Sequence, residues 1–446
     1  MSFVLGEYRI TGRGASAIAA SIESAVGSGA LPPGETLPPL RELARALDVN
    51  PNTVAAAYRL LRDRGVIETA GRRGSRVRSR PATAPRDEIR IDVPARARDI
   101  STGNPDTALL PPLADALAAA AVHHAQAPVL YGSAPVDAEL GALARAAFDA
   151  DGVPDGPISL TSGSLDAIER VLAAHLRPGD AVAVEDPGWG SVLDLVPAMG
   201  LRAVPVGVDD EGPLVADVAR ALAGGARALV VTDRGQNPTG AALSAERAAE
   251  LRELLAAHRD VLVIDDDHVH GLTDLPLHCL AGATEHWALV RSTAKAYGPD
   301  LRLAVSTGDA LTVDRVRGRY RLGAGWVSHL LQRTVVHLWR NDAVDVDATA
   351  RSYTARREAL LRALADRGVA AHGRSGMNIW VPVSDETGAV AGLLQHGWAV
   401  APGARFRARS APGIRLTVSP LAHEDIEPLA DAVAAVLRPA GASRYA

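Results

Sequence analysis

The chain has 446 residues, of which 47% are hydrophobic and 22% are charged, and this length predicts two or three globular domains. The sequence shows no signal peptide and no apolar run long enough to span a bilayer, so we expect a cytoplasmic protein and exclude a membrane-spanning one. The single Cys279 excludes an internal disulfide, which agrees with a reducing compartment.

Charge is distributed unevenly along the chain, although the formal net charge is only −5 at pH 7. Residues 1–80 hold 12 arginines against 7 acidic residues, a net charge of +5, which leaves −10 on the remainder. The basic part of the chain is therefore its N-terminal end.

Three helices are predicted in this basic part, over residues 14–28, 37–47 and 50–62. The second has Pro38 or Pro39 in its first turn, where a missing N–H costs nothing. Three of its leucines are expected to share one face: Leu40, Leu43 and Leu47. The third helix is predicted to have Asn50 as its N-cap and Pro51 as its first residue.

The second and third helices are joined by the short turn Asp48-Val49, which predicts a helix-turn-helix. Asn52 and Thr53 lie near the start of the third helix, where side chains would face base edges and phosphates. Strand-like residues 66–69 and 75–78 follow as a hairpin, with two arginines in its Gly71-Arg72-Arg73-Gly74 tip. A small helical module with a solvated basic face is the alternative.

The whole span resembles the winged-helix domain of the GntR family of transcription regulators. The resemblance is carried by Leu31-Pro32-Pro33-Gly34, by Leu37-Pro38-x-x-Arg41-x-Leu43-Ala44 and by the glycine-rich wing. It implies that a domain over residues 1–80 binds double-stranded DNA. The contacts that it implies are Arg41, Asn52, Thr53 and Arg73. Residues 81–99, which are polar and interrupted by prolines, are predicted to be a linker.

From residue 100 to 446, short apolar runs alternate with Ala- and Leu-rich helical stretches. Six strands are predicted, at 158–160, 181–184, 228–231, 261–264, 288–290 and 303–305. Because these runs lack alternation, they indicate an α/β fold with a mostly parallel sheet covered on both faces. Ligands bind at the carboxyl ends of strands in such folds.

Polar motifs follow several of these runs. Thr161-Ser162-Gly163-Ser164 opens a helix, whose free N–H groups and dipole make a phosphate site. Glu185-Asp186-Pro187-Gly188-Trp189, Asn237-Pro238-Thr239-Gly240 and Asp265-Asp266-Asp267-His268 follow later strands. The Asn-Pro pair alone could be a turn, and the three adjacent acids alone could form a metal site or a solvated loop.

Lys295 is the only lysine of the chain. Arginine stays protonated, whereas a lysine amine can lose its proton and attack a carbonyl to form a Schiff base. Ser292 precedes Lys295 by three residues and Arg302 follows it by seven. A chance surface lysine is the alternative, which the surrounding motifs disfavour.

This spacing resembles the cofactor lysine of the fold-type I pyridoxal-phosphate enzymes, the aminotransferase class. The resemblance implies a mostly parallel seven-stranded sheet, a smaller C-terminal α+β domain and pyridoxal 5'-phosphate (PLP) bound to Lys295 as an aldimine. Phosphate contacts are implied for Tyr131, Ser162, Gly163, Ser164, Ser292 and Arg302. Tyr131, in Leu130-Tyr131-Gly132, commonly reaches the phosphate across a dimer interface in this class.

The same resemblance assigns the ring and carboxylate contacts. Trp189 would stack on the pyridine ring, and Asn237 would donate to its phenolic oxygen. PLP needs a carboxylate to keep its ring nitrogen protonated. Asp266 takes that role when residues are counted as in the regulators, and Asp265 takes it when they are counted as in many aminotransferases; we prefer Asp266. His268 stands where the regulators usually have a tyrosine that contacts the phenolic oxygen.

Arg415, in Pro412-Gly413-Ile414-Arg415-Leu416-Thr417, lies where the aminotransferase class has an arginine that binds a carboxylate through two hydrogen bonds. No metal site is predicted. From about residue 8 to 437, the chain resembles the MocR-type branch of GntR regulators. This implies a homodimeric transcription factor in which PLP, or an amino acid or amine, changes DNA affinity. The alternatives are a working aminotransferase that carries a DNA-binding module, and a DNA-binding module with a degenerate cofactor domain.

Overall fold

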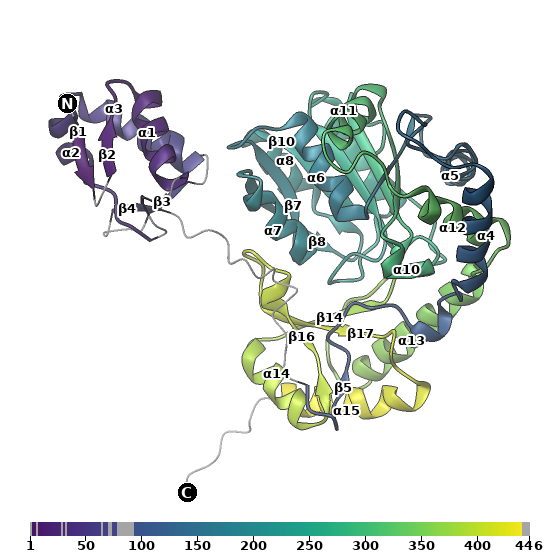
Figure 1. Cartoon of the computed structure of the whole chain (residues 1–446). Coiled ribbons are helices and arrows are strands. Elements are labelled where there is room, and N and C mark those ends of the chain that lie inside the picture. The colour runs from purple at the N-terminus through teal and green to yellow at the C-terminus, as the bar shows by residue number, and fades with distance from the viewer. Residues whose placement is uncertain are drawn as a thin grey trace, which may run out of the picture. The chain divides into compact units, whose positions relative to one another are not determined.

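The computed structural model describes residues 2–5, 8–27, 30–31, 34–63, 66–69, 74–77 and 93–438 (Figure 1). The N-terminal part and the body that begins at residue 93 are described separately below. None of the helices in the described ranges is long and apolar enough to cross a membrane.

The N-terminal part contains the predicted helices, α1 Ala15–Gly27, α2 Leu40–Leu47 and α3 Pro51–Asp63. Strands β3 Ile67–Thr69 and β4 Ser75–Val77 pair antiparallel as the predicted wing. A second hairpin, β1 Ser2–Leu5 with β2 Tyr8–Thr11, was not predicted. One apolar core joins these elements and includes the buried Ile10, Ile22, Leu43, Leu61 and Val77.

The start of α3 follows the predicted capping pattern. The Asn50 side chain accepts a hydrogen bond from the Asn52 N–H at 2.8 Å, which satisfies one of the free donors of the first turn. In α2, Leu43 and Leu47 are buried, whereas Leu40 is exposed. Leu40 is the first helical residue, because the helix starts after the two prolines instead of including them.

The body is built on a mixed sheet whose described strands have the order β6-β13-β12-β11-β10-β7-β8-β9. In that order they are β6 Ile158–Thr161, β13 Ala304–Gly308, β12 His286–Ser292, β11 Leu262–Asp267, β10 Ala226–Thr232, β7 Ala181–Asp186, β8 Arg202–Asp209 and β9 Gly212–Pro213. All six predicted strands are present. The eighth strand arises because the two-residue β9 pairs with the end of β8.

Strand directions bring the polar motifs to one edge. β10, β11 and β12 are parallel, while β13 runs antiparallel to both β12 and β6. β6 therefore runs in the same direction as β10, β11 and β12. The carboxyl ends of these four strands lie at the same edge, which is where ligands bind in such sheets.

A smaller C-terminal α+β domain completes the body. Its sheet, β14 Asn378–Pro382, β17 Gly413–Thr417 and β16 Ala401–Pro402, lies with α13 Val346–Ala365, α14 Glu386–Gln395 and α15 Ile426–Leu437 (Figure 1). β15 Trp398–Ala399 pairs in parallel with β5 Arg98–Asp99. The body thus begins its pairing two residues before the predicted boundary at residue 100.

The remaining α-helices of the described body are α4 Ala114–Gln126, α5 Ala138–Ala150, α6 Ser164–His175, α7 Gly190–Ala198, α8 Val215–Ala223, α9 Ala245–Ala256, α10 Ala294–Tyr297, α11 Ala310–Arg321 and α12 His329–Arg340. α12 packs against α4, and the two run side by side in Figure 1.

Candidate functional site

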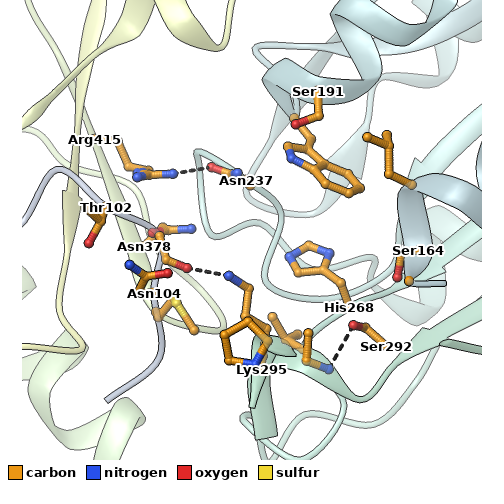
Figure 2. Close-up of a pocket in the computed structure, with 18 of the residues that line it drawn as sticks. Thr102, Asn104, Ser164, Ser191, Asn237, His268, Ser292, Lys295, Asn378 and Arg415 are labelled. Atoms are coloured by element: carbon orange, nitrogen blue, oxygen red, sulfur yellow. Dashed lines mark hydrogen bonds between the residues drawn. The ribbon is translucent and has the colours of Figure 1, made fainter. Parts of the chain in front are cut away.

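A cavity of about 1020 Å³ lies between the strand ends of the large sheet and the small domain (Figure 2). Nine residues that the sequence analysis selected line it: Gly163, Ser164, Trp189, Asn237, His268, Ser292, Lys295, Arg302 and Arg415. They come from segments up to 252 positions apart, which the fold brings to one place.

Lys295 is positioned by the turn from β12 into α10. Ser292 ends β12, and its hydroxyl accepts a hydrogen bond from the Ala294 N–H at 3.1 Å, which fixes the entry into the short helix. The Lys295 amine projects from α10 into the cavity and donates to the Gly103 carbonyl (Figure 2).

The turn from β6 into α6 forms a basic cradle. Arg302, with a left-handed φ of 44°, donates to the Ser162 carbonyl at 2.7 Å. A Cβ atom on Gly163, whose φ is 101°, would lie 3.0 Å from the Arg302 guanidinium, so only glycine fits this turn without displacing it. The buried hydroxyl of Ser164 has no hydrogen-bond partner among the described residues. The guanidinium and this hydroxyl lie at the N-terminal end of α6, an arrangement that can hold an anion.

Two predicted phosphate contacts lie outside the cavity lining. The Ser162 hydroxyl lies 3.1 Å from the Tyr320 hydroxyl and hydrogen bonds to it, and the Ser162 carbonyl accepts from Arg302. Tyr131 is 93% exposed, and its ring contacts only the edge of Trp326 at a centroid distance of 5.6 Å among the ring pairs described. Tyr131 therefore does not reach the cavity of its own chain.

The three consecutive aspartates of β11 have different surroundings, because successive strand side chains point to opposite faces. Asp266 Oδ2 lies 2.9 Å from His268 Nδ1, while its buried Oδ1 has no hydrogen-bond partner in the described structure. Asp265 accepts from the Leu280 N–H on the other face. Of the two candidates, only Asp266 adjoins a residue of the cavity.

The surroundings shift the pKa values of two buried acids near the cavity, Asp267 and Glu185, in opposite directions. Burial alone would raise the pKa of Asp267, but its ion pairs with Arg234 and Arg291, both at 2.8–2.9 Å, lower it well below the usual range. Burial raises the pKa of Glu185 to about 7, and the negative charge of Asp266 adds to this rise.

Arg415 is a residue of β17 and lines the cavity from the small domain. Its guanidinium donates to Asn237 Oδ1 at 2.9 Å and to the Ser101 carbonyl at 2.7 Å. The ring of Phe406 lies against it at 4.6 Å. The Asn237 oxygen is thereby used, which leaves its amide nitrogen as the donor for a ligand.

Residues 101–104 line the cavity, as the resemblance of the stretch 101–106 to the start of the aminotransferase body implies for the region of Gly103. Sequence reasoning missed the polar lining residues Ser191 on α7 and Asn378 and Arg405 in the small domain. Arg405 and Phe406 follow the Pro402-Gly403 turn shortly before the strand of Arg415, and this turn was the available signal.

The predicted DNA contacts lie on the winged helix. Arg41 and Asn52 are exposed, on α2 and at the start of α3, and Thr53 beside Asn52 is partly buried. The wing is braced by an ion pair between Arg76 and Glu68 at 2.6 Å. Arg73 lies outside the described residues.

Comparisons with known proteins agree with this architecture. Residues 99–433 match the family model for class I and II aminotransferases, and residues 15–77 match that for bacterial regulatory proteins of the gntR family. The chain is 42% identical to the vitamin B6 salvage pathway transcriptional repressor PtsJ of Salmonella typhimurium, over 94% of this chain and 98% of the repressor.

Solved structures resemble the body. A mutant aspartate aminotransferase of Thermus thermophilus is 26% identical with a TM-score of 0.68, over 78% of this chain and all (100%) of that one. The kynurenine aminotransferase of Pyrococcus horikoshii, solved with PMP, has the same TM-score of 0.68 at 21% identity, over 77% of this chain and 92% of that one.

The fold and the cavity define a fold-type I aminotransferase-like domain that follows a winged helix. The chain belongs to the class I and II aminotransferase family through its body and to the gntR family through its N-terminal domain, which makes it a GntR regulator of the MocR type. It is a DNA-binding regulator, and the cofactor of its body is pyridoxal 5'-phosphate.

Proposed function

We propose that this regulator binds PLP through a covalent bond between the Lys295 amine and the cofactor aldehyde, and that occupation of the cavity changes its affinity for DNA. The observation that carries the proposal is a pair of buried polar atoms without hydrogen-bond partners in the described structure, Asp266 Oδ1 and Ser164 Oγ. Such groups are costly to bury unless a ligand satisfies them. A protonated ring nitrogen would satisfy the first and a phosphate oxygen the second.

When bound, PLP supplies an aldehyde and an electron-withdrawing ring. Asp266 would hold the ring nitrogen in its protonated form, with His268 fixing the other carboxylate oxygen. Asn237 would donate to the phenolic oxygen, and Trp189 would cover the ring. Phosphate binding would fall to the cradle of Gly163, Ser164, Ser292 and Arg302.

The effector is PLP itself or an amino compound whose carboxylate binds Arg415. The sequence identity of 42% to a vitamin B6 salvage pathway repressor, over nearly the full length of both chains, supports PLP as the effector and vitamin B6 genes as targets. Regulation requires that the effector bind two conformations of the protein unequally. The DNA partner also supports action in the cytoplasm.

We also propose that the body forms a homodimer. Leu130 and Tyr131, 70% and 93% exposed, follow α4, and Leu322, 90% exposed, follows α11. Exposed apolar side chains that form a patch mark interaction surfaces, and these three are candidates for such a patch. In the dimer, Tyr131 would reach the cavity of the partner, where its predicted phosphate contact would be made.

The decisive test is an absorption spectrum of the purified full-length protein with PLP, compared with Lys295→Ala and Lys295→Arg. We expect a visible band only in the wild type, because alanine lacks an amine and a protonated guanidinium does not attack an aldehyde. DNA affinity is then measured with and without PLP by fluorescence anisotropy, on a duplex selected from a random pool. Equal spectra in all three proteins would rule out the covalent site.

An active aminotransferase remains the second candidate, because Lys295 and the full set of motifs accompany a class I and II aminotransferase domain. Lys295 would then act as the general base. Turnover of an amino donor with a 2-oxo acid at about 1 per second or faster, a rate typical of enzymes, would favour this candidate. A stoichiometric spectral change without turnover favours the regulator.

A further inference from the structure

A buried amide of the cavity takes no part in the proposed function. Asn378 begins β14 in the small domain, is 5% exposed and lines the cavity (Figure 2). An amide at this depth is costly to bury unless its oxygen and its nitrogen both find hydrogen-bond partners. The partners that the two atoms have, and those that they lack, therefore indicate what the amide can bind.

The oxygen of this amide is bound within the protein. The hydroxyl of Thr417 donates to Asn378 Oδ1 at 3.1 Å. Thr417 is fully buried on β17, and it is the residue directly opposite Asn378 in the antiparallel pair of β14 and β17. Because this hydrogen bond runs straight across the strand pair, it fixes the orientation of the amide and turns the nitrogen away from Thr417.

The nitrogen of the same amide is available to a ligand. Among the described residues, Asn378 Nδ2 has no hydrogen-bond partner. The nitrogen is not sealed inside the protein either, so it is accessible from the cavity that Asn378 lines. A primary amide nitrogen carries two N–H donors and accepts no hydrogen bond. The small domain thus presents a neutral donor group to the cavity.

Strand register places this donor next to Arg415. Arg415 is opposite Trp380, and Thr417 is opposite Asn378. Residues directly opposite each other, and residues two positions apart in one strand, face the same side of a sheet. Asn378 and Arg415 are therefore diagonal neighbours on one face, within reach of the same small molecule. A compound whose carboxylate binds Arg415, as proposed above, would carry its remaining atoms close to the Asn378 amide.

We propose that Asn378 determines the specificity of the cavity, and that the effector is an amino acid whose side chain presents a hydrogen-bond acceptor to the Asn378 nitrogen. The inference rests on the proposed function and names the chemical class of its effector. An alkyl side chain of the same size would leave both N–H groups without partners, which a site built to donate a hydrogen bond discriminates against. Hydroxyl and carbonyl oxygens share the required chemistry, and the experiment separates them.

The test uses the full-length, PLP-loaded protein and follows the change of its absorption band as an amino acid is added. The compounds are compared in sets of nearly equal shape: L-threonine with L-valine, and L-asparagine and L-aspartate with L-leucine. We expect the preferred compound to half-saturate the change at a concentration about fivefold to a hundredfold below its alkyl counterpart, because the counterpart leaves a buried donor unsatisfied. A preference for L-threonine identifies a hydroxyl oxygen, and a preference for L-asparagine or L-aspartate identifies a carbonyl or carboxylate oxygen.

Variants locate the preference. Asn378→Leu removes the donor and should reduce the preference within each set to less than about twofold. Asn378→Asp keeps an acceptor for Thr417 but replaces the donor with an oxygen, so this variant should bind L-asparagine more tightly than L-aspartate, which cannot donate. Gln395→Leu is the matched control, because Gln395 is an exposed amide of the small domain, on α14, that does not line the cavity. It should keep the preference of the wild type.

Several outcomes would overturn the inference. Equal half-saturation within both sets in the wild type would do so alone, even if Asn378→Leu did not fold. The wild-type preference retained in Asn378→Leu, or in Asn378→Asp, would place the recognition of the side chain elsewhere. A Lys295-dependent band that no compound of the panel changes would overturn the inference and leave the PLP site of the proposed function intact. Absence of that band would contradict the proposed function as well, so the two failures are distinguishable.

Discussion

At the scale of single residues, Asp233 and Asp265 form a buried acid pair behind the candidate site. Both are fully buried, and three of their four carboxylate oxygens have no hydrogen-bond partner among the described residues. Burial raises the pKa of Asp265 to about 6. Burial and the neighbouring Asp265 raise the pKa of Asp233 well above its usual range. One proton shared by the two carboxyl groups would satisfy both.

This pair predicts a pH-dependent stability. The unfolded chain ionises both groups above about pH 4, whereas the folded chain retains a proton, so stability falls as pH rises from about 4 through 6. Asp233→Asn removes one charge and keeps a donor for Asp265. We expect it to raise the free energy of unfolding by about 1–3 kcal/mol near pH 8, with a smaller gain near pH 5.

Urea unfolding at several pH values measures this difference. Asp260→Asn is the control, because Asp260 is exposed and should change nothing. Parallel stability profiles of Asp233→Asn and wild type would show that the pair carries no shared proton.

At the scale of elements, the cap of α3 connects stability with DNA binding. Asn50 binds the first turn of the helix, whereas the exposed Asn52 side chain is predicted to contact DNA. Asn50→Ala should lower the stability of the N-terminal domain by about 0.5–2 kcal/mol, because it removes the N-cap. Asn52→Ala should leave that stability nearly unchanged and weaken DNA binding.

Thermal unfolding and fluorescence anisotropy, applied to both variants, separate the two effects. If Asn52→Ala binds DNA as tightly as the wild type at low and at high salt, Asn52 does not contact DNA. Unchanged melting of Asn50→Ala would contradict the capping role.

Helices and strands whose own residues show an apolar run or a capping pattern could be predicted from the sequence. Strands that form only by pairing with a distant strand could not. The strands 228–231 and 261–264 are continuous apolar runs, and α3 has a cap and a proline at its start, so each follows from its own residues. β5 and β15 have two residues each and exist only because they pair. No periodicity can indicate such short strands.

The site divides in the same way. Ser164, Asn237 and Lys295 follow apolar strand-like runs and lie in recognisable motifs, so the sequence was sufficient to select them. The loop that carries Arg405 is fixed by hydrogen bonds from Ala404 to Glu386 and from Ala408 to Asp186, which no local sequence pattern indicates. The hydrogen bond between the Ser162 hydroxyl and Tyr320, 158 residues away, could not be predicted from the local sequence either.

At the scale of the whole molecule, several exposed apolar side chains lie on or next to α4 and α12 in the sequence. They are Leu117, Val122, Leu130, Tyr131, Leu322 and Leu330. The packing of α12 on α4 and the contact of Tyr131 with Trp326 bring these segments together. A surface of this kind supports the proposed homodimer.

Leu322→Glu should therefore produce a monomer, because a carboxylate buried without a partner costs several kcal/mol. Light scattering coupled to size exclusion measures the mass. Leu311→Glu, at the other end of α11 and 45% exposed, should remain dimeric. Identical masses for both variants would place the dimer contact elsewhere, and a monomer that binds PLP as tightly as the wild type would exclude a phosphate contact by the partner subunit's Tyr131.

Lys295 and Arg415 both donate to carbonyls of one short segment, those of Gly103 and Ser101. A ligand that binds the Lys295 amine or the Arg415 guanidinium must displace the carbonyl of this segment that the cation now binds. The segment therefore competes with the ligand as part of the same chain. The measured affinity of a ligand is consequently its intrinsic affinity less the cost of releasing this segment. The same residues follow directly on β5, which lies at the end of the predicted linker, so a displacement of this segment would act next to the point where the linker joins the body.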